Sequence, residues 1–408
     1  MLDRYDLAVV GGGAAGLVAA VSAARRGASV AVLERMPRPG KKILATGGGR
    51  CNLLNERLSP EDFTSTSPAL VASVLNRFGR EDIRAFFKGL GLEMSSDESG
   101  RVFPATNQAS SVLRVLEIEI GRLGVAVLTG FDADGLASSA KGFSIVSESG
   151  RKIEARAVIL AGGGRAYPAL GSNGGCYGLA ERMGHKIVLP VPSAVSLVVK
   201  DPMCHLLQGQ KVRVLATGLV GGRVTRSAEG ELLFTQYGLS GTAVIDISEG
   251  LSVAVNREGR RDAAVLVDLV PFMPEERLSA ECLRRLNAGW AAKDLTAGLL
   301  PDKFSLVVPQ ALKEAGLSGE TANPEKACRA LASALKAKRF AVSGTRGWNE
   351  AEFTSGGVDA REVKPKTLGS QLRKGLYFAG EILDVQGGRG GYNLAWAWAS
   401  GFVAGLGE

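Results

Sequence analysis

The chain has 408 residues, enough for two or three domains at the usual size of about 150 residues each. Its composition, 45% hydrophobic and 22% charged, is typical of a soluble globular protein, and no stretch reaches the roughly 18 uninterrupted apolar residues of a membrane span. The net charge is +8, but the basic residues are spread along the chain apart from short clusters such as residues 257–261. This even distribution does not favour a nucleic acid partner. No secretory signal pattern is present, so we expect a cytoplasmic protein without a membrane partner. The oligomeric state is left open.

The sequence offers few ligands for a metal ion. Only His185 and His205 could supply imidazole ligands. The five cysteines are Cys51, Cys176, Cys204, Cys282 and Cys328. No two of them have the spacing of a zinc site or a redox dithiol. We therefore predict no metal site. We interpret Cys51, in a glycine-rich segment, as a small buried residue rather than a reactive thiol.

The N-terminal segment has the pattern of a dinucleotide-binding unit. An apolar strand at residues 5–10 leads into Gly11, Gly13 and Gly16, then an alanine-rich helix and a second strand that ends at Glu34. Gly11 permits the tight turn, Gly13 lets the backbone approach a pyrophosphate, and Gly16 lets the helix pack against the strand. Glu34, at the expected offset of about 20 residues, can accept a hydrogen bond from a ribose hydroxyl. The motif alone does not distinguish NAD, NADP and FAD.

Residues 37–52 follow, and their prolines and glycines predict a loop without regular structure. Basic side chains at Lys41, Lys42 and Arg50 accompany three consecutive glycines at 47–49. Exposed glycine amides next to cations form a candidate anion-binding nest. A plain surface loop is the alternative interpretation of this segment.

The next part combines helices with short strands. Helical patterns cover residues 68–78, 81–90 and 110–123. Residues 101–104 are a short strand or turn, and a three-stranded meander is predicted at residues 125–128, 142–147 and 153–160. The last of these strands runs into Gly162 and Gly164, which lack the spacing of a second fingerprint. We therefore expect no separate NAD(P) domain.

From about residue 196 the pattern changes. Alternating strands are predicted at residues 196–199, 212–216, 231–234 and 243–247, and helices at residues 275–288, 307–314 and 324–338. The last helix is predicted to begin with Asn323 as its N-cap and Pro324 at its first position. Residues 375–381 then form another buried strand, and residues 391–393 open an apolar helix. We predict an α/β fold with a discontinuous Rossmann-like domain and β-meander, interrupted by a β-barrel-like insert that carries a small helical subdomain. The predicted boundaries are 1–195 plus 342–408 for the nucleotide domain, 196–273 with 339–341 for the β insert, and 274–338 for the helical subdomain.

These motifs resemble the bacterial FAD-dependent oxidoreductases of the BaiN-like or aminoacetone-oxidase-like family, among the two-dinucleotide-binding-motif flavoproteins. The resemblance covers the whole chain. It is carried by residues 11–16 with Glu34, 46–52, 234–241, 344–346, 354–358, 375–381 and 391–394. It implies that FAD, rather than another dinucleotide, is the cofactor. Two residues depart from the family pattern: Gln236 stands where the family usually has His, and Arg389 lies in a turn that is often acidic or contains threonine.

The resemblance also implies a set of cofactor contacts. Residues 11–16 would hold the pyrophosphate, and Glu34 the adenosine ribose. The amides at 391–393 would face the flavin pyrimidine edge, where a helix N-terminus favours negative charge. The full predicted set is Gly11, Gly13, Ala14, Ala15, Gly16, Glu34, Arg35, Lys42, Gly49, Arg50, Cys51, Asn52, Ala133, Ala161, Gly162, Gly380, Glu381, Gly391, Tyr392 and Asn393. Predicted substrate-side residues are Arg50, Asn52, Tyr167, Gln236 and Arg389.

The sequence thus predicts an FAD-dependent oxidoreductase in which flavin N5 transfers a hydride between a small organic substrate and NAD(P)H or another acceptor. NAD(P)H is the candidate transient reductant. Two alternatives stay open: a flavin-dependent RNA-modifying enzyme, because related flavoproteins act on tRNA and the chain is basic, and a non-enzymatic flavin-binding redox protein. For Trp396 and Trp398 we expect packing rather than electron transfer.

Overall fold

A computed structural model describes residues 4–314 and 323–407. The chain forms two compact units, the first from the N-terminal segment through Pro190 together with the segment from Phe353 onward, and the second from Val191 to Glu352. The predicted boundaries between the nucleotide domain and the insert, at 195/196 and 341/342, lie inside the second unit. The predicted helical subdomain, 274–338, includes residues 315–322, which lie outside the described residues.

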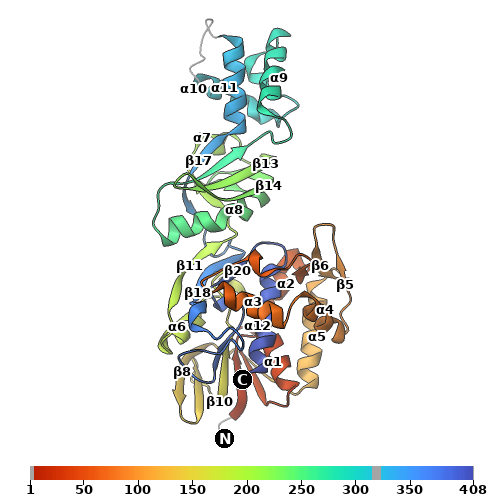
Figure 1. Cartoon of the computed structure of the whole chain (residues 1–408), viewed down its shortest axis with the longest axis vertical. Coiled ribbons are helices and arrows are strands. Elements are labelled where there is room, and N and C mark those ends of the chain that lie inside the picture. Colours follow the sequence, from red (N-terminus) through yellow and green to blue (C-terminus); the bar gives the residue numbers. More distant parts are fainter. Residues whose placement is uncertain (1–3, 315–322, 408) are drawn as a thin grey trace. The chain divides into compact units, whose positions relative to one another are not determined.

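The first unit is built on a sheet with the order β7-β2-β1-β10-β9-β8, and β19 also pairs with β10 (Figure 1). Its strands are β1 (Arg4–Val10), β2 (Val30–Glu34), β7 (Ala126–Thr129), β8 (Ala133–Ser139), β9 (Gly142–Ser147), β10 (Lys152–Leu160) and β19 (Leu376–Phe378). β7, β2, β1, β10 and β19 pair in parallel, whereas β9 and β8 pair antiparallel. Except at Glu34, β2 and the C-terminal halves of β1 and β10 are apolar and buried, because both of their faces are covered.

Helices cover this sheet. They are α1 (Ala14–Ala24), α2 (Lys41–Ala45), α3 (Pro68–Arg77), α4 (Arg80–Gly89), α5 (Ala109–Arg122), α6 (Gly175–Arg182) and α12 (Tyr392–Leu406). α1 and α12 lie side by side although they come from opposite ends of the chain (Figure 1). Their close approach depends on glycine, since a Cβ atom on Gly401 would lie 2.3 Å from the Ala15 carbonyl oxygen. Trp396 and Trp398 are buried in this core, as predicted.

Short strands complete the first unit in three small sheets. The first contains β3 (Leu54–Asn55), β6 (Arg101–Pro104) and β5 (Met94–Ser96), and the second contains β20 (Val385–Gly387) and β4 (Phe63–Ser65). The third contains β18 (Phe353–Val358) and β11 (Ile187–Ser193), whose last three residues are counted with the second unit.

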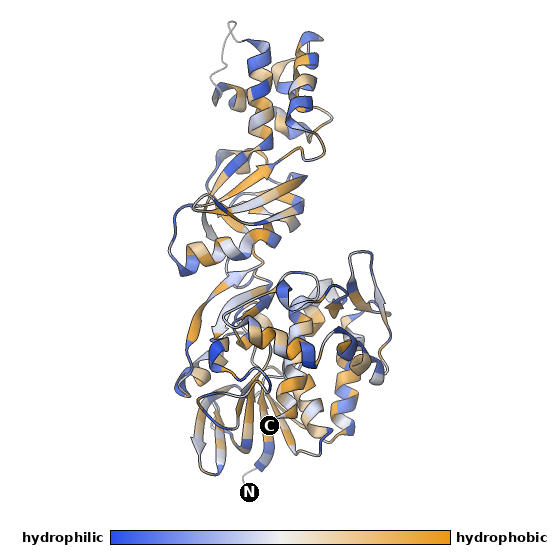
Figure 2. Ribbon diagram, viewed as in Figure 1, coloured by the Kyte–Doolittle hydropathy of each residue, from blue (hydrophilic) through white to orange (hydrophobic). Residues whose placement is uncertain are grey.

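The second unit is a closed barrel with the order β12-β15-β14-β13-β16-β17. Its strands are β12 (Leu197–Val199), β13 (Lys211–Val220), β14 (Arg223–Thr235), β15 (Gly238–Ser240), β16 (Ala263–Asp268) and β17 (Lys338–Thr345). Its helices are α7 (Pro202–Leu206), α8 (Thr242–Ser252), α9 (Glu275–Asn287), α10 (Val308–Glu314) and α11 (Pro324–Lys336). In Figure 2, α9 and α11 each carry hydrophobic and hydrophilic residues, and they bury Leu278, Cys282 and Leu331 between them and the barrel. The predicted Rossmann-like domain with a barrel-like insert and helical subdomain is confirmed.

Three predictions about individual elements were wrong. Residues 243–247 belong to α8 rather than to a strand, because Ala243, Val244, Ile247 and Leu251 are buried at helical spacing. The loop predicted over 37–52 contains α2, since the glycines follow this helix instead of interrupting it. Residues 125–128 do not start the meander: β7 pairs in parallel with β2, and β8 is the first strand of the meander.

Candidate cofactor site

The glycine turn after β1 has the geometry that the fingerprint requires. Gly11 has φ of 108°, and a Cβ atom there would lie 2.5 Å from the Ala161 carbonyl oxygen. A Cβ atom on Gly16 would lie 1.9 Å from the Gly11 carbonyl oxygen. A Cβ atom on Gly13 would meet nothing within 4 Å. Gly13 is the N-cap residue of α1, and no side chain caps this helix. The first amides of α1 are therefore available to an anion.

Glu34 ends β2 and turns its carboxylate toward this glycine turn. Oε2 accepts a hydrogen bond from the Gly12 amide and Oε1 accepts one from the Met36 amide, both at 2.7 Å. Burial raises the pKa of Glu34, while the two amide donors act in the opposite direction. Each oxygen keeps a further lone pair that could accept from a ribose hydroxyl. Next to it, Arg35 forms a 3.0 Å ion pair with Asp132, the residue before Ala133 on β8.

A second cluster joins four chain segments. Lys42 Nζ lies 2.7 Å from Glu381 Oε2, and both side chains are mostly buried. Glu381 Oε1 accepts a hydrogen bond from the Thr354 amide at 2.8 Å. A Cβ atom on Gly164 would lie 2.2 Å from Thr354 Oγ1 and 3.0 Å from Glu381 Oε1. The cluster therefore joins the segments after three strands, namely β2, β10 and β19, to the first residues of β18.

The segment after α2 has positive φ at the three glycines 47–49 and at Cys51, with Arg50 between them in the right-handed helical region. Arg50 donates to the Gly47 carbonyl oxygen at 3.1 Å, and its guanidinium lies 4.8 Å from the centre of the Phe103 ring. Cys51 has φ of 60° and is fully buried, and burial raises the pKa of its thiol to about 12. The interpretation of Cys51 as a buried, unreactive residue agrees with this environment.

The N-terminus of α12 reaches the same loop. Gly391 precedes the helix with φ of 103°, and a Cβ atom there would lie 2.8 Å from Asn52 Oδ1. Asn52 Oδ1 is buried and has no hydrogen-bond partner among the described residues. No side chain caps α12. The Asn393 side chain instead accepts a hydrogen bond from the Gly387 amide at Oδ1 and donates one from Nδ2 to the Gly387 carbonyl oxygen. The uncapped helix N-terminus offers hydrogen-bond donors and the buried Asn52 oxygen offers an acceptor, so together they suit a polar ligand.

The predicted substrate-side residues occupy different places. Arg50 and Asn52 lie in the loop after α2, and Arg389 lies in the glycine-rich turn before α12. Tyr167 lies in the loop after β10, with φ of 56° and a side chain that is 36% exposed. Gln236 is exposed in the turn between β14 and β15, which belongs to the second unit.

Not every predicted cofactor contact offers a free donor. The Gly380 amide already donates to Ser400 Oγ at 2.9 Å, and its carbonyl oxygen accepts from Trp396 Nε1. Gly380 has φ of 78°, and a Cβ atom there would lie 2.8 Å from the Ala15 Cβ atom. Gly380 therefore shapes the space between α1 and α12.

Two residues at the site had no role in the sequence-based prediction. Thr354 accepts from the Arg165 amide at 2.8 Å and carries the amide that binds Glu381. Gln386 is 3% exposed, and its Oε1 has no hydrogen-bond partner among the described residues. Thr354 lies in one of the motifs that carried the family resemblance, so a signal existed, whereas nothing in the sequence singled out Gln386.

These residues fit an FAD molecule. The carboxyl ends of β1, β2, β10 and β19 meet at one edge of the sheet, which is where open α/β sheets bind nucleotides. Two uncapped helix N-termini, at α1 and α12, offer donors for the pyrophosphate and for the flavin pyrimidine edge. The glycines at 11, 13 and 391 keep that edge free of side chains.

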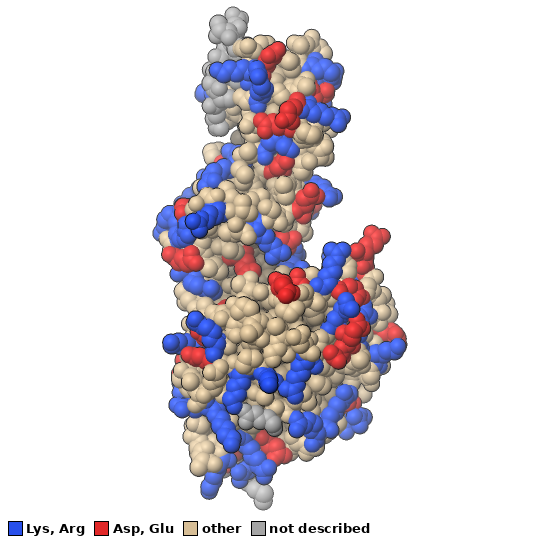
Figure 3. Space-filling view, viewed as in Figure 1, with Lys and Arg blue, Asp and Glu red and all other residues tan. Residues whose placement is uncertain are grey.

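Other surface features are less specific. Lys and Arg are interspersed with Asp and Glu over the face seen in Figure 3. Within residues 4–314 and 323–407 no helix is long and apolar enough to cross a membrane. In the same ranges, no three His, Cys, Asp or Glu side chains gather as metal ligands would.

Comparison with known proteins places the chain in a family. The model of the HI0933-like protein Rossmann domain matches residues 5–407. The 3-dehydro-bile acid delta(4,6)-reductase of Clostridium scindens is 37% identical over 98% of both chains. The ribosomal RNA dihydrouridine synthase of Haemophilus influenzae is 30% identical over 98% of this chain and 97% of its own.

A solved structure supports the fold. The 3-ketosteroid-delta4-(5alpha)-dehydrogenase of Rhodococcus jostii RHA1 superposes with a TM-score of 0.51 at 16% identity, over 99% of this chain and 96% of the other. The predicted family and enzyme class are confirmed. The chain belongs to the HI0933-like family and is an FAD-dependent oxidoreductase.

Proposed function

We propose that the protein transfers a hydride through flavin N5 from NAD(P)H to a small organic substrate, reducing a carbon–carbon double bond conjugated to a carbonyl group. Support comes from two relatives that match over nearly their full length. The names of the C. scindens and H. influenzae enzymes both describe saturation of a double bond conjugated to a carbonyl, in a 3-oxo steroid acid and in uracil. The observation that carries the proposal is the uncapped N-terminus of α12 beside the unpaired Asn52 oxygen.

The residues of the site divide the work of holding the cofactor. The turn at Gly11 and Gly13 and the first amides of α1 would bind the pyrophosphate, and Glu34 would accept from the ribose. The N-terminus of α12 would favour negative charge at the pyrimidine edge through its dipole. Bound FAD supplies the hydride carrier, accepting from NAD(P)H and donating to the substrate.

The substrate needs two further groups from the protein. When hydride adds to the β carbon, the carbon–carbon π pair moves between the α carbon and the carbonyl carbon, and the carbonyl π pair moves onto oxygen. A proton then adds to the α carbon and the carbonyl group re-forms. The guanidinium groups of Arg50 and Arg389 are candidates to stabilise that oxygen. The Tyr167 hydroxyl is the candidate proton donor. The side-chain amide of Asn52 would orient the substrate by hydrogen bonds.

An anaerobic titration tests this function. NADH or NADPH should bleach the visible absorbance of the purified holoprotein, and a 3-oxo-4,6-diene steroid should restore it, with one carbon–carbon double bond saturated for each flavin reoxidised. A matched saturated 3-oxo steroid is the control and should leave the flavin reduced. Flavin that neither nicotinamide reduces would contradict the proposal.

A second candidate is dihydrouridine synthesis on RNA. Two relatives with this name, from H. influenzae and Escherichia coli, are each 30% identical over 98% of this chain. Exposed arginines at one end of the barrel also favour it, namely Arg223, Arg226, Arg260 and Arg261. In the same anaerobic assay, reoxidation by a uridine-containing ribosomal RNA fragment but not by the dienone would select this candidate.

A further inference from the structure

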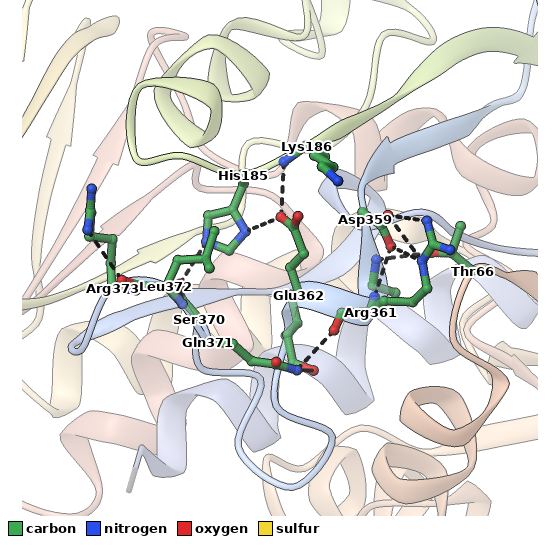
Figure 4. Close-up of polar contacts among 12 residues, drawn as sticks. Thr66, His185, Lys186, Asp359, Arg361, Glu362, Ser370, Gln371, Leu372 and Arg373 are labelled. Carbon is green, nitrogen blue, oxygen red and sulfur yellow. Dashed lines mark hydrogen bonds and ion pairs between the residues drawn. The ribbon is translucent and has the colours of Figure 1, made fainter.

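His185 is a buried histidine that the proposed reaction does not use. It follows α6 and precedes β11, and it is 3% exposed. Its ring lies between Glu362 and Ser370 (Figure 4). Nδ1 is 3.1 Å from Glu362 Oε2, and Nε2 is 2.7 Å from Ser370 Oγ. A buried histidine hydrogen-bonded at both nitrogens has a defined protonation state.

The hydrogen bonds around Ser370 determine that state. Its Oγ accepts from the amides of Leu372 at 3.0 Å and Arg373 at 2.9 Å, so both of its lone pairs are occupied. The hydroxyl hydrogen is then left for Nε2 of His185, which must be unprotonated to accept it. Nδ1 carries the proton and donates to Glu362, which also accepts from the Lys186 amide at 3.0 Å. This network fits neutral histidine.

The same network is connected to the strand that leads into the cofactor site. The Ser370 amide donates to the Leu376 carbonyl oxygen at 2.7 Å, and the Phe378 amide donates to the Leu368 carbonyl oxygen at 3.0 Å. The His185 ring also packs edge-on against Phe378, with 4.7 Å between ring centres. Phe378 ends β19, two residues before Gly380.

Protonation would disturb this arrangement. A proton on Nε2 would point at an oxygen whose lone pairs are already engaged, so Ser370 would have to release an amide or move. The charged groups that face the ring are Glu362, which raises the pKa of His185, and Arg373, which lowers it. Burial lowers it further and is the largest effect, so the pKa of His185 lies below its usual range.

We propose that neutral His185 is a positioning residue for the cofactor, acting through Ser370 and β19 on the Gly380 turn, and that its protonation promotes release of FAD. The proposal depends on the FAD site and not on the substrate. Histidine in an unfolded chain has a pKa of about 6.5, so the contribution of neutral His185 to the stability of the folded protein is complete above that pH. It is lost as the pH falls from there through the lower pKa of the folded protein.

The test measures FAD release by flavin fluorescence, between about pH 8 and pH 5, for the wild-type holoprotein and for His185→Gln. Glutamine can donate to Glu362 and accept from Ser370 but does not titrate. Wild-type protein should release FAD increasingly as the pH falls, whereas the variant should show a flat profile over this range. A His185→Gln profile with the wild-type midpoint would overturn the proposal.

A second variant keeps the test decisive if His185→Gln does not fold. Arg373 is exposed, and Arg373→Glu replaces a cation facing the ring by an anion, so the release midpoint should move to higher pH. Arg26→Glu makes the same charge reversal at an exposed site after α1 and should leave the midpoint unchanged. Equal midpoints for the two variants would contradict the proposal, and neither result depends on whether NAD(P)H reduces the flavin.

Discussion

Two glycines in the same turn restrict the chain in different ways. A Cβ atom on Gly16 would collide with the Gly11 carbonyl, whereas a Cβ atom on Gly13 would meet nothing within 4 Å. The backbone of Gly13 is also extended, with φ of −82°, which any residue adopts. Gly16 is therefore required by the fold itself, and we infer that Gly13 is required by the ligand.

This difference leads to a paired prediction. Gly16→Ala should lower the free energy of unfolding of the apoprotein by about 1–3 kcal/mol, because the close contact must be relieved by backbone movement. Gly13→Ala should leave the melting temperature of the apoprotein unchanged and weaken FAD binding at least about tenfold. Calorimetry of apoprotein and FAD titration separate the two effects. A destabilised Gly13→Ala apoprotein would contradict the assignment.

The ion pair between Lys42 and Glu381 gives a second prediction at this scale. Lys42→Met would leave the Glu381 carboxylate without its cation, at the edge where we propose that the dianionic pyrophosphate of FAD binds. The pair is mostly buried, so we expect a loss of about 1 kcal/mol, or about fivefold in the dissociation constant for FAD. Lys41→Met removes the neighbouring cation and is the control. Equal effects of the two variants, measured by fluorescence titration, would show that only overall charge matters.

At the scale of elements, contact between α1 and α12 holds the two ends of the chain together. A Cβ atom on Gly405 would lie 2.4 Å from the Ala19 carbonyl oxygen, because the helices approach through small residues. Gly405→Ala should therefore lower the free energy of unfolding by about 1–3 kcal/mol. Gly178→Ala in α6 is the matched control: it meets open space, and alanine favours helix, so stability should be unchanged or slightly higher. Denaturant unfolding of both variants checks this.

At the scale of the whole molecule, the two units should respond differently to the cofactor. FAD bound to the first unit stabilises it by about 2.7 kcal/mol at a free concentration one hundred times the dissociation constant. Hydrogen exchange should slow in the strands β1, β2 and β10, and much less in the barrel strands β13 and β14. Equal protection of both units would mean that they unfold as one cooperative body.

Some features of the fold and site followed from sequence because they are local. The strand and glycine turn at residues 5–16, the N-cap at Asn323 and the helix that opens after Gly391 each depend on a few adjacent residues. The N-cap is confirmed by hydrogen bonds from the amides of Glu325 and Lys326 to Asn323 Oδ1. The alternation at residues 243–247 was misleading, because a short apolar run suits a strand as well as a buried helix.

The sequence by itself determined a dinucleotide-binding unit and a discontinuous nucleotide domain, since these depend on glycine spacing and on local apolar patterns. The resemblance of its motifs to a known family then identified the family and FAD as the cofactor. Tertiary structure alone decided that Lys42 meets Glu381, that Asn52 meets Gly391 and that His185 meets Ser370. The partners in these pairs are separated by between 185 and 339 residues. No local pattern records such contacts, because they exist only once parallel strands from both ends of the chain share one sheet.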